Sequence, residues 1–400
     1  MIITLVTDQF FQNNHGTSVS AQRIHDELVK RGHTVRVLAV CNNNGTAYAL
    51  KERYFGKPIT KLINSQGFIF AKPDKDTMRK AIEGADIVHV YMPFKLGYKT
   101  IKMCREMNVP CTAAFHIVPE NITSTLYMED FHLLNFSLWQ KFYNSTYRYV
   151  QHIHCPSLMV AKQLEKHKFN STLHVISNGY NNIFRMQKEE KPEMFKNKFV
   201  ITFVGRFSRE KRYDLIIKAV NASKHRDQIQ LIFGGKGPVK KQIMKMAMKL
   251  PNYPVFSFFT QQQLISLFNF ADLYIHPADI EVEGMSCLEA IACGCVPVVS
   301  DSQKSASSQF AVSKHSIFKN GDFKSLAQQI DWWIEHPEEL KAEKEIVAKH
   351  AQNFTVEKSM NFYINMFEQA IKDWNKNFDG KAKDAPKPKI VNYYETTEVE

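Results

Sequence analysis

Short apolar runs alternate with helical spacing along the first half of the chain. The runs IITLVTD (2–8) and TVRVLAV (34–40) are almost continuously apolar, which is typical of strands buried on both faces. Between them, VSAQRIHDELVKRG (19–32) carries apolar residues three and four positions apart and ends at Gly32, as an amphipathic helix would. Two later runs follow helical stretches in the same way: DIVHVYM (86–92) and CTAAFHI (111–117). This alternation predicts a parallel, doubly wound α/β sheet.

The same alternation begins again after a charged linker, QKEEKPEMFKNK (187–198). We expect further strands in five segments: FVITFVGRF (199–207), QIQLIFGGKGP (228–238), PVFSFF (254–259), ADLYIHP (271–277) and VPVVS (296–300). Two similar halves joined by a charged hinge near residues 186–198 predict two facing Rossmann-like domains with a cleft between them.

The predicted boundaries follow from these patterns. We expect an N-terminal domain over residues 1–188 and a C-terminal domain over residues 199–353. The helical spacing of residues 354–374 predicts a helix that closes the fold. Residues 375–400 contain DGKAKDAPKPK and an acidic end, so we expect a disordered tail there.

Length and composition fit two domains with real cores, because the chain has 400 residues of which 44% are hydrophobic. No run of about 18 apolar residues could span a membrane, and the chain opens with a strand-like run rather than a secretion signal. The seven cysteines show no Cys-x-x-Cys pair, and Cys293 and Cys295 are too close for an ordinary zinc half-site. We therefore expect a reduced, cytoplasmic protein.

The net charge of +12 is unevenly distributed. Residues 1–188 hold 23 Lys and Arg against 13 Asp and Glu, a net +10, whereas the rest holds 29 against 27, a net +2. A basic half suits an anionic surface such as membrane headgroups, nucleic acid or an acidic polymer. A solvated basic face with no partner is an equally open alternative.

The stretch EVEGMSCLEAIACGCVPVVSD (281–301) combines two carboxylates with a glycine turn. Gly284, Met285 and Ser286 stand where a helix begins, and a helix start offers unpaired N–H groups and partial positive charge to a phosphate. Glu281 and Glu289 flank this turn, and a carboxylate accepts two hydrogen bonds from a vicinal diol such as a sugar presents. A capping box formed by Ser286 and Glu289 is an alternative reading that needs no ligand.

Neither half carries a dinucleotide fingerprint. The segment NNHGTS has one glycine where Gly-x-Gly-x-x-Gly is needed, and the chain has no Walker lysine motif. An NAD-dependent enzyme and a P-loop NTPase are therefore disfavoured.

Several motifs, taken in order, resemble the retaining glycosyltransferases of family 4, which have the GT-B fold. These motifs are NNHGTS, AAFH, ISNGYNNIF, VGRFSREKRYDLIIKAV, FGGKGP and the 281–301 stretch. The resemblance covers about residues 1–375. The opening DQF…NNHGTSVSA is similar to members that glycosylate diacylglycerol or ceramide-like lipids.

The resemblance implies a donor site in the second half. Arg206 and Lys211 match the pair that holds the donor diphosphate, and two cations after a buried strand can neutralise it without metal. Glu289 matches the ribose-binding glutamate and Glu281 the one that contacts the sugar hydroxyls. The remaining matches are the phosphate-binding backbone of Gly284, Met285 and Ser286, and the turn near the base with Gly235, Gly237 and Pro238. The alternative for Arg206 and Lys211 is that they are solvated surface cations. The alternative for the glycine turn is an ordinary strand-to-helix turn without a ligand.

In the first half, Gly16 and Thr17 match a loop that closes over the donor phosphate. This chain has His15-Gly16 where many relatives have paired glycines, which leaves the closeness of the backbone approach open. His116 matches a histidine on the acceptor side that would orient the donor sugar or the attacking hydroxyl. A lone histidine at a strand end is often structural, so that alternative stands beside the first.

The resemblance also implies the chemistry. Retaining members carry no evident side-chain nucleophile, so the leaving diphosphate would itself accept the acceptor's proton, and no metal or other cofactor is expected. We expect UDP-glucose or UDP-galactose as donor and a membrane lipid hydroxyl of diacylglycerol or ceramide type as acceptor. The alternatives are a transferase of capsule or cell-wall glycan assembly and a non-catalytic sugar-nucleotide binder.

Two segments of the first half suit docking on anionic lipid at the inner face of the cell membrane. Residues 131–150 are rich in Leu, Phe, Trp and Tyr, and residues 51–80 hold eight Lys or Arg against three acidic residues. The alternative is that the aromatic residues belong to the core and the lysines are only solvated. No nucleic-acid-reading motif accompanies the charge, so a nucleic-acid partner is not expected.

Overall fold

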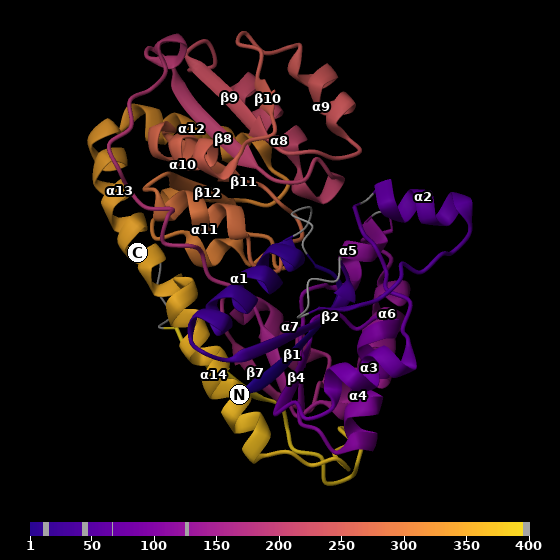
Figure 1. The fold of residues 1–400 in the computed structure, drawn as a ribbon. Coiled ribbons are helices and arrows are strands. Elements are labelled where there is room, and N and C mark those ends of the chain that lie inside the picture. The colour runs from indigo at the N-terminus through magenta and orange to yellow at the C-terminus, as the bar shows by residue number, and fades with distance from the viewer. Residues whose placement is uncertain (11–15, 42–46, 66, 125–127, 395–400) are drawn as a thin grey trace. The chain divides into compact units, whose positions relative to one another are not determined.

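The structure is a computed structural model that describes residues 1–10, 16–41, 47–65, 67–124 and 128–394. The chain forms two compact units (Figure 1). The first comprises Met1–Gly179 and Val356–Tyr394, and the second comprises Tyr180–Thr355. Each unit is built on its own parallel sheet, as the alternation of apolar runs and helices predicts.

The sheet of the first unit has eight strands in the order β14-β7-β6-β5-β4-β1-β2-β3, all parallel. Its strands are β1 (Ile2–Gln9), β2 (Thr34–Val40), β3 (Ala47–Ala49), β4 (Ile87–Val90), β5 (Cys111–Ala114), β6 (His152–Cys155), β7 (Thr172–Val175) and β14 (Lys389–Asn392). The four strands predicted from the apolar runs, β1, β2, β4 and β5, are confirmed. The buried residues of these strands form the core of the unit.

Helices cover both faces of this sheet. They are α1 (Gly16–Lys30), α2 (Lys57–Ser65), α3 (Lys75–Ile82), α4 (Lys95–Met107), α5 (Pro119–Thr123), α6 (His132–Ser145), α7 (Leu158–Lys166) and α14 (Val356–Lys372). The α1 helix packs against β1, β2 and α14, while α3 and α4 pack against each other and against β1 to β4. Gly32, at φ +82°, follows the end of α1, where the sequence places the helix stop.

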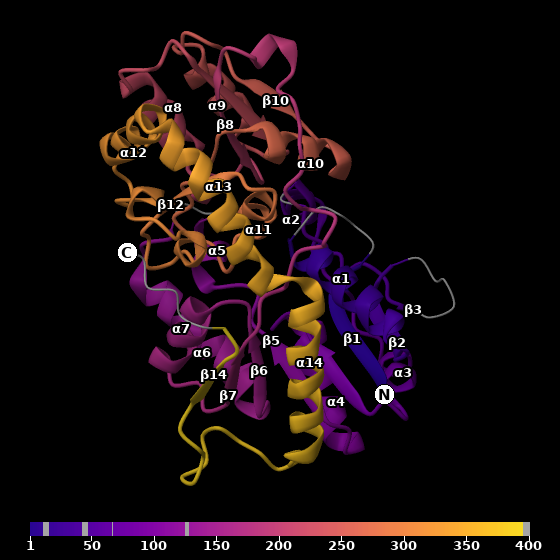
Figure 2. The same cartoon turned by 90° about the vertical axis from the view of Figure 1, so that its left-hand side faces the viewer.

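The expectation of a disordered tail is wrong for the residues up to 394. Strand β14 pairs in parallel with β7 at the edge of the sheet (Figure 2). The turn before it is held by Arg148, whose Nε donates to Asp379 at 2.9 Å, and by the Gly380 N–H, which donates to the Arg148 carbonyl at 2.8 Å. The reason is local: the charged and proline-rich segment ends in KIVNYY (389–394), an apolar and aromatic run that can cover an exposed sheet edge.

The second unit has a six-stranded parallel sheet in the order β10-β9-β8-β11-β12-β13. Its strands are β8 (Phe199–Val204), β9 (Ile229–Gly234), β10 (Val255–Ser257), β11 (Leu273–His276), β12 (Val296–Ser300) and β13 (Ile317–Phe318). Its helices are α8 (Tyr213–Ala222), α9 (Lys240–Ala247), α10 (Gln261–Phe270), α11 (Met285–Ala292), α12 (Phe323–Glu335) and α13 (Pro337–Ala351). All five strands predicted for this half are confirmed.

Each sheet has one place where the order of strands reverses direction. In the first unit this switch point lies between β1 and β4, and in the second it lies between β8 and β11. Open α/β sheets bind their ligands outside the carboxyl ends of the strands at such a point. These two positions are therefore where ligand-binding residues are expected.

Among the described residues, no helix combines the length and apolar character that crossing a membrane requires. All seven cysteines are free thiols, six of them buried.

Candidate functional site

The switch point of the second unit places three predicted segments together. Arg206 follows the end of β8 by two residues, and Glu281 follows the end of the neighbouring β11 by five. The hydroxyl of Tyr274 in β11 lies 3.1 Å from the Val204 carbonyl oxygen and 2.7 Å from Oγ of Ser286, at the start of α11. This hydroxyl ties the ends of β8 and β11 to α11.

A three-residue cluster, in which His276 is buried and Lys211 and Glu281 are partly exposed, forms the centre of the site. Lys211 Nζ pairs with Glu281 Oε2, and His276 Nε2 lies 3.2 Å from the same oxygen. Because an ionised carboxylate only accepts hydrogen bonds, Nε2 of His276 is the donor. We name Lys211, His276 and Glu281 the Lys-His-Glu cluster.

The cluster fixes the charge of each member. Burial raises the pKa of Glu281, but the positive charge of Lys211 and the hydrogen bond from His276 outweigh burial and bring this pKa to about 2. Burial lowers the pKa of His276, although Glu281 opposes the shift. Glu281 is therefore an anion and His276 a neutral donor at neutral pH, so Glu281 stands ready to accept hydrogen bonds from hydroxyl groups.

His276 is a site residue that the sequence analysis missed. It lies at the end of β11, and its side chain is only 1% exposed. The available signal was its place in ADLYIHP, a polar residue that closes an apolar strand five positions before Glu281. The structure shows no hydrogen-bond partner for its Nδ1 among the residues that it describes.

The start of α11 adjoins the cluster. Gly284 is the residue before the helix, at φ +93°, and a Cβ there would lie 3.6 Å from Cγ of Glu281 and 3.7 Å from Cε1 of His276. The unpaired N–H groups of the first turn therefore lie beside Glu281, in the position expected for a phosphate site. Met285 is the first residue of the helix.

The capping-box reading of Ser286 and Glu289 is wrong. A capping box needs Ser286 just before the helix, whereas that position belongs to Gly284, which makes no side-chain cap. Ser286 lies inside the first turn, where its hydroxyl is bonded to Tyr274. Glu289, 9% exposed, lies one turn further along the same helix.

The glycine turn after β9 packs on the loop that carries Arg206. A Cβ on Gly235 would lie 1.9 Å from the Gly205 carbonyl oxygen, and one on Gly237 would lie 2.3 Å from the Phe207 carbonyl oxygen. The Phe207 N–H donates to the Lys236 carbonyl at 2.9 Å. Gly235 and Gly237 are therefore required for the close approach of two backbones, and they set the position of Arg206.

Arg206 is half-buried next to this turn. Burial lowers the pKa of its guanidinium, and Glu210 opposes the shift. An arginine keeps its charge in proteins, so the switch point holds two cations, Arg206 and Lys211. Lys211 is engaged by Glu281 in this structure, which means that an incoming diphosphate would share this lysine with the carboxylate.

The other predicted site residues belong to the first unit. Gly16 and Thr17 are the first residues of α1, while His15 and the residues before it lie outside the described part of the chain. His116 follows β5 and stacks on Tyr91, with ring centroids 5.4 Å apart. Burial, together with nearby His89, lowers the pKa of His116 to about 3, so the ring is neutral at physiological pH.

The chain contains one Asp-x-Asp sequence, Asp74-Lys75-Asp76, a motif that holds a divalent metal in some nucleotide-sugar enzymes. Asp74 caps the start of α3, where its carboxylate accepts from the Thr77 N–H at 2.9 Å and the Thr77 hydroxyl at 2.7 Å. Within the described ranges, no three His, Cys, Asp or Glu side chains are placed to hold a metal ion.

Two family models match consecutive parts of the chain. Residues 15–182 match the model described as Glycosyltransferase Family 4, and residues 184–350 match the one described as Glycosyl transferases group 1. These ranges follow the two units and include all predicted site residues.

Relatives and solved structures agree with these models. The alpha-monoglucosyldiacylglycerol synthase of Streptococcus pneumoniae is 24% identical over 325 residues, covering 75% of this chain and 70% of the synthase. The GDP-mannose-dependent alpha-mannosyltransferase of Corynebacterium glutamicum is 24% identical over 315 residues, covering 75% of this chain and 72% of that enzyme. The structure of Anabaena HepE in complex with UDP and glucose matches 92% of this chain and 100% of its own, with 15% identity and a TM-score of 0.69. The chain belongs to the family 4 type of glycosyltransferases with the GT-B fold.

Proposed function

We propose that the protein is a retaining, metal-independent hexosyltransferase that moves glucose or galactose from a UDP-sugar to the hydroxyl of a membrane lipid. The observation that carries this proposal is the Lys-His-Glu cluster at the switch point, beside the start of α11. It combines a cation for a diphosphate with an ionised carboxylate for sugar hydroxyls, and both are held before substrate arrives.

In the proposed donor site, different residues would bind the different parts of the UDP-hexose. Arg206, Lys211 and the N–H groups at Gly284 to Ser286 would bind the diphosphate, and Glu281 would accept hydrogen bonds from the hexose. Glu289 would bind the ribose hydroxyls. The Anabaena HepE structures with UDP and with UDP-glucose support this class of donor, while the GDP-mannose-dependent relatives make GDP-mannose the competing donor to be tested.

The proposed reaction is front-side substitution at the anomeric carbon. The bond from this carbon to the diphosphate oxygen breaks while the lipid oxygen bonds to the same face, and the lipid's proton passes to the leaving phosphate oxygen. Arg206 and Lys211 would stabilise the negative charge that develops on the leaving group. The product would be an α-glycolipid and UDP, and Arg206 and Lys211 would supply the positive charge in place of a metal.

The surface of the first unit supports a lipid acceptor. Three apolar side chains at and near the start of α6 are exposed to solvent: Phe131 (51%), Leu133 (76%) and Phe136 (56%). Other aromatic residues of the same segment belong to the core instead, because Trp139, Phe142 and Tyr143 are buried. Exposed apolar residues on a basic unit suit peripheral docking at the inner face of the cell membrane. The diacylglycerol-modifying relative in S. pneumoniae points to the same acceptor class.

The test is turnover on membranes. Purified protein is incubated in EDTA with UDP-glucose, UDP-galactose or GDP-mannose and with liposomes that contain diacylglycerol, ceramide or cholesterol, and extracted lipids are analysed by mass spectrometry. We expect a gain of one hexose with a UDP-sugar and an α-configured product by NMR. Transfer only from GDP-mannose would overturn the donor assignment, and release of UDP without any glycolipid would overturn the acceptor assignment.

A further inference from the structure

The first unit contains a cavity of about 290 Å³ that no predicted site residue lines. Its wall is mostly apolar, formed by Phe55, Ile59, Ile63, Phe70, Ala71 and Phe94. Three charged side chains, Asp8, Arg53 and Lys95, complete it. Sites for small molecules have this composition, an apolar wall with a few placed polar groups. The cavity is slightly smaller than the usual size range of such sites, so it suits one segment of a larger molecule.

The cavity stands at the switch point of its sheet. Asp8 is the next-to-last residue of β1, whereas Phe94 and Lys95 follow β4, on the other side of the strand-order reversal. Ligands of open α/β sheets bind at this position. The cavity therefore has the same place in the first unit that the Lys-His-Glu cluster has in the second.

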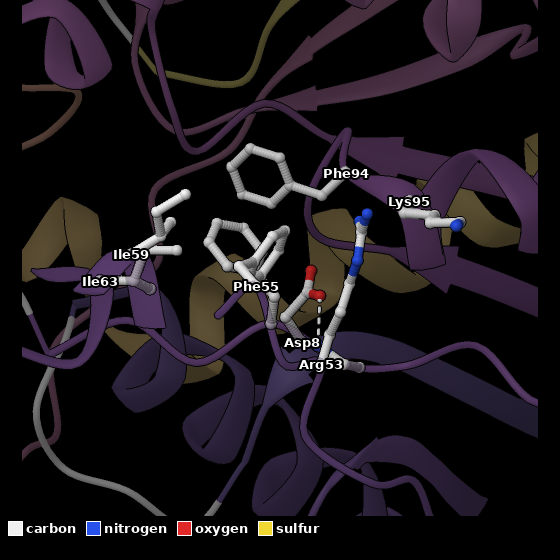
Figure 3. Close-up of a pocket in the computed structure, with 9 residues that line it drawn as sticks. Asp8, Arg53, Phe55, Ile59, Ile63, Phe94 and Lys95 are labelled. Carbon is white, nitrogen blue, oxygen red and sulfur yellow. Dashed lines mark hydrogen bonds between the residues drawn. The ribbon is translucent and has the colours of Figure 1, made fainter. Parts of the chain in front are cut away.

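Asp8 is the polar group inside the cavity. The residue is only 7% exposed, and its Oδ1 accepts from the Ala71 N–H at 3.0 Å. Within the described residues, the structure shows a hydrogen bond to Oδ1 of this carboxyl group and none to Oδ2. Figure 3 shows the carboxyl group between the Phe55 ring and the Arg53 side chain, below the Phe94 ring. One oxygen is thus fixed by the backbone, and the other remains available to a ligand.

The charges around the cavity restrict what it can hold. Burial raises the pKa of Asp8 to about 7, although the Ala71 N–H and the charge of Arg53 oppose the shift. A carboxyl group near half-protonation can accept a hydrogen bond or donate one. The ionised form of this carboxyl group would repel an anionic ligand, and Arg53 and Lys95 would repel a cationic ligand. An uncharged molecule with a hydroxyl group fits both constraints.

The rim of the cavity suits a membrane surface. Ile59 on α2 is 52% exposed, and the neighbouring Lys57 and Lys61 are exposed as well. The Arg53 guanidinium lies 4.5 Å from the Phe55 ring centroid. Apolar and basic side chains next to an apolar cavity would let a lipid pass from anionic headgroups into the protein.

We propose that this cavity binds the hydroxyl-bearing end of an uncharged lipid alcohol, with Asp8 hydrogen-bonded to the hydroxyl and the phenylalanine and isoleucine side chains around its first methylene groups. That this lipid alcohol is the acceptor of the transfer rests on the proposed function. It assigns Asp8 as the polar contact for that acceptor.

Binding is measured directly, without turnover. The probes are dioctanoylglycerol and its O-methyl ether, added to the full chain in detergent and followed by isothermal titration calorimetry. The wild type should bind the alcohol about fivefold more tightly than the ether, because a net hydrogen bond contributes on the order of 1 kcal/mol. Asp8→Ala should abolish this preference. Asp8→Asn, which can still accept from the Ala71 N–H, should retain a preference.

A second variant tests the cavity itself. Ile63→Trp should fill it and weaken binding of the alcohol at least tenfold, while the matched exposed change Ile346→Trp in the second unit should leave binding unchanged. UDP binding to each variant reports an intact donor site. Equal affinity of wild type and Ile63→Trp for the alcohol, or an alcohol preference that survives Asp8→Ala, would overturn the proposal.

The two proposals can fail separately. Probe binding that Ile63→Trp abolishes, without glycolipid formation by the wild type, would support the cavity and refute the lipid transferase. Glycolipid formation that Ile63→Trp and Asp8→Ala leave unchanged would refute the cavity as the acceptor site and leave the transferase standing.

Discussion

Replacement of Gly235 by alanine tests the claim that the glycine turn sets the position of Arg206. Gly235 has φ +137°, and an added Cβ would lie 1.9 Å from the carbonyl oxygen of Gly205. Because real Cβ contacts are essentially never shorter than 3.0 Å, one backbone must move by about 1 Å. Because Gly205 directly precedes Arg206, either movement changes the position of the glycine turn relative to Arg206.

Gly321 provides a matched control in the same unit. It also has a positive φ, +75°, but an added Cβ would meet nothing within 4 Å. Both alanine variants bear the cost of a left-handed residue, about 1–2 kcal/mol, and only Gly235→Ala adds a clash of about 1–3 kcal/mol. An added 2 kcal/mol corresponds to a melting temperature lower by about 4–8 °C in a unit of this size.

Differential scanning fluorimetry and UDP titration measure the two effects. We expect Gly235→Ala to melt below Gly321→Ala and to bind UDP at least tenfold more weakly than the wild type, with Gly321→Ala close to wild type in affinity. Equal melting temperatures and equal UDP affinities of the two variants would show that the turn does not position Arg206, and the reasoning would be wrong.

Three further predictions concern the first unit. Because folding raises the pKa of Asp8 from 3.8 to about 7, the contribution of this group to the free energy of unfolding is full below pH 4 and is lost as the pH rises through 7. Denaturant unfolding at pH 5 and pH 8 should therefore show a free energy of unfolding that is lower by about 2–3 kcal/mol at pH 8. The variant Asp8→Asn should remove this difference. Since the pKa of His116 lies near 3, NMR of labelled histidines should show no titration of this ring between pH 8 and 5. Deletion of residues 389–400 removes β14, so hydrogen exchange should speed up at residues 172–175 while UDP affinity stays constant; unchanged exchange would contradict the edge pairing.

The sheets could be predicted because buried parallel strands produce continuous apolar runs. Strands such as β8 and β12 are buried along nearly their whole length, and their runs stand out between helical stretches. β6 (HIHC) and β7 (TLHV) were missed because histidines interrupt their runs, although His152, His154 and His174 are buried and hydrogen-bonded within the unit. A buried, partnered histidine looks like a surface residue in the sequence.

The residues of the proposed donor site could be located from the sequence because they follow strand ends. Lys211 and Glu281 were placed from motifs, and the structure joins them by an ion pair. Their partner His276 and the packing of Gly235 on Gly205 depend on contacts between strands, which periodicity does not reveal. For Ser286 the local sequence pattern was misleading, because it suggested a helix cap. The structure instead places Ser286 inside the first turn of the helix, where its hydroxyl is hydrogen-bonded to Tyr274.

The cavity in the first unit could not be predicted at all. It combines β1, the segment after β3, α2 and the start of α4, and the residue pattern of each looks ordinary by itself. Asp8 reads as the polar end of a strand. Its burial and its unusual pKa arise only when the segment around Ala71 folds over it.

The most direct test of the account is the mass of the lipid product. Wild type and Arg206→Ala are incubated in EDTA with UDP-glucose or UDP-galactose and diacylglycerol liposomes, and the extracted lipid is analysed by mass spectrometry. The account predicts diacylglycerol heavier by one hexose with the wild type, and a loss of at least a hundredfold in this product with Arg206→Ala, as for removal of one charge-stabilising donor. Product that requires a divalent metal, or that forms equally well with Arg206→Ala, would contradict it.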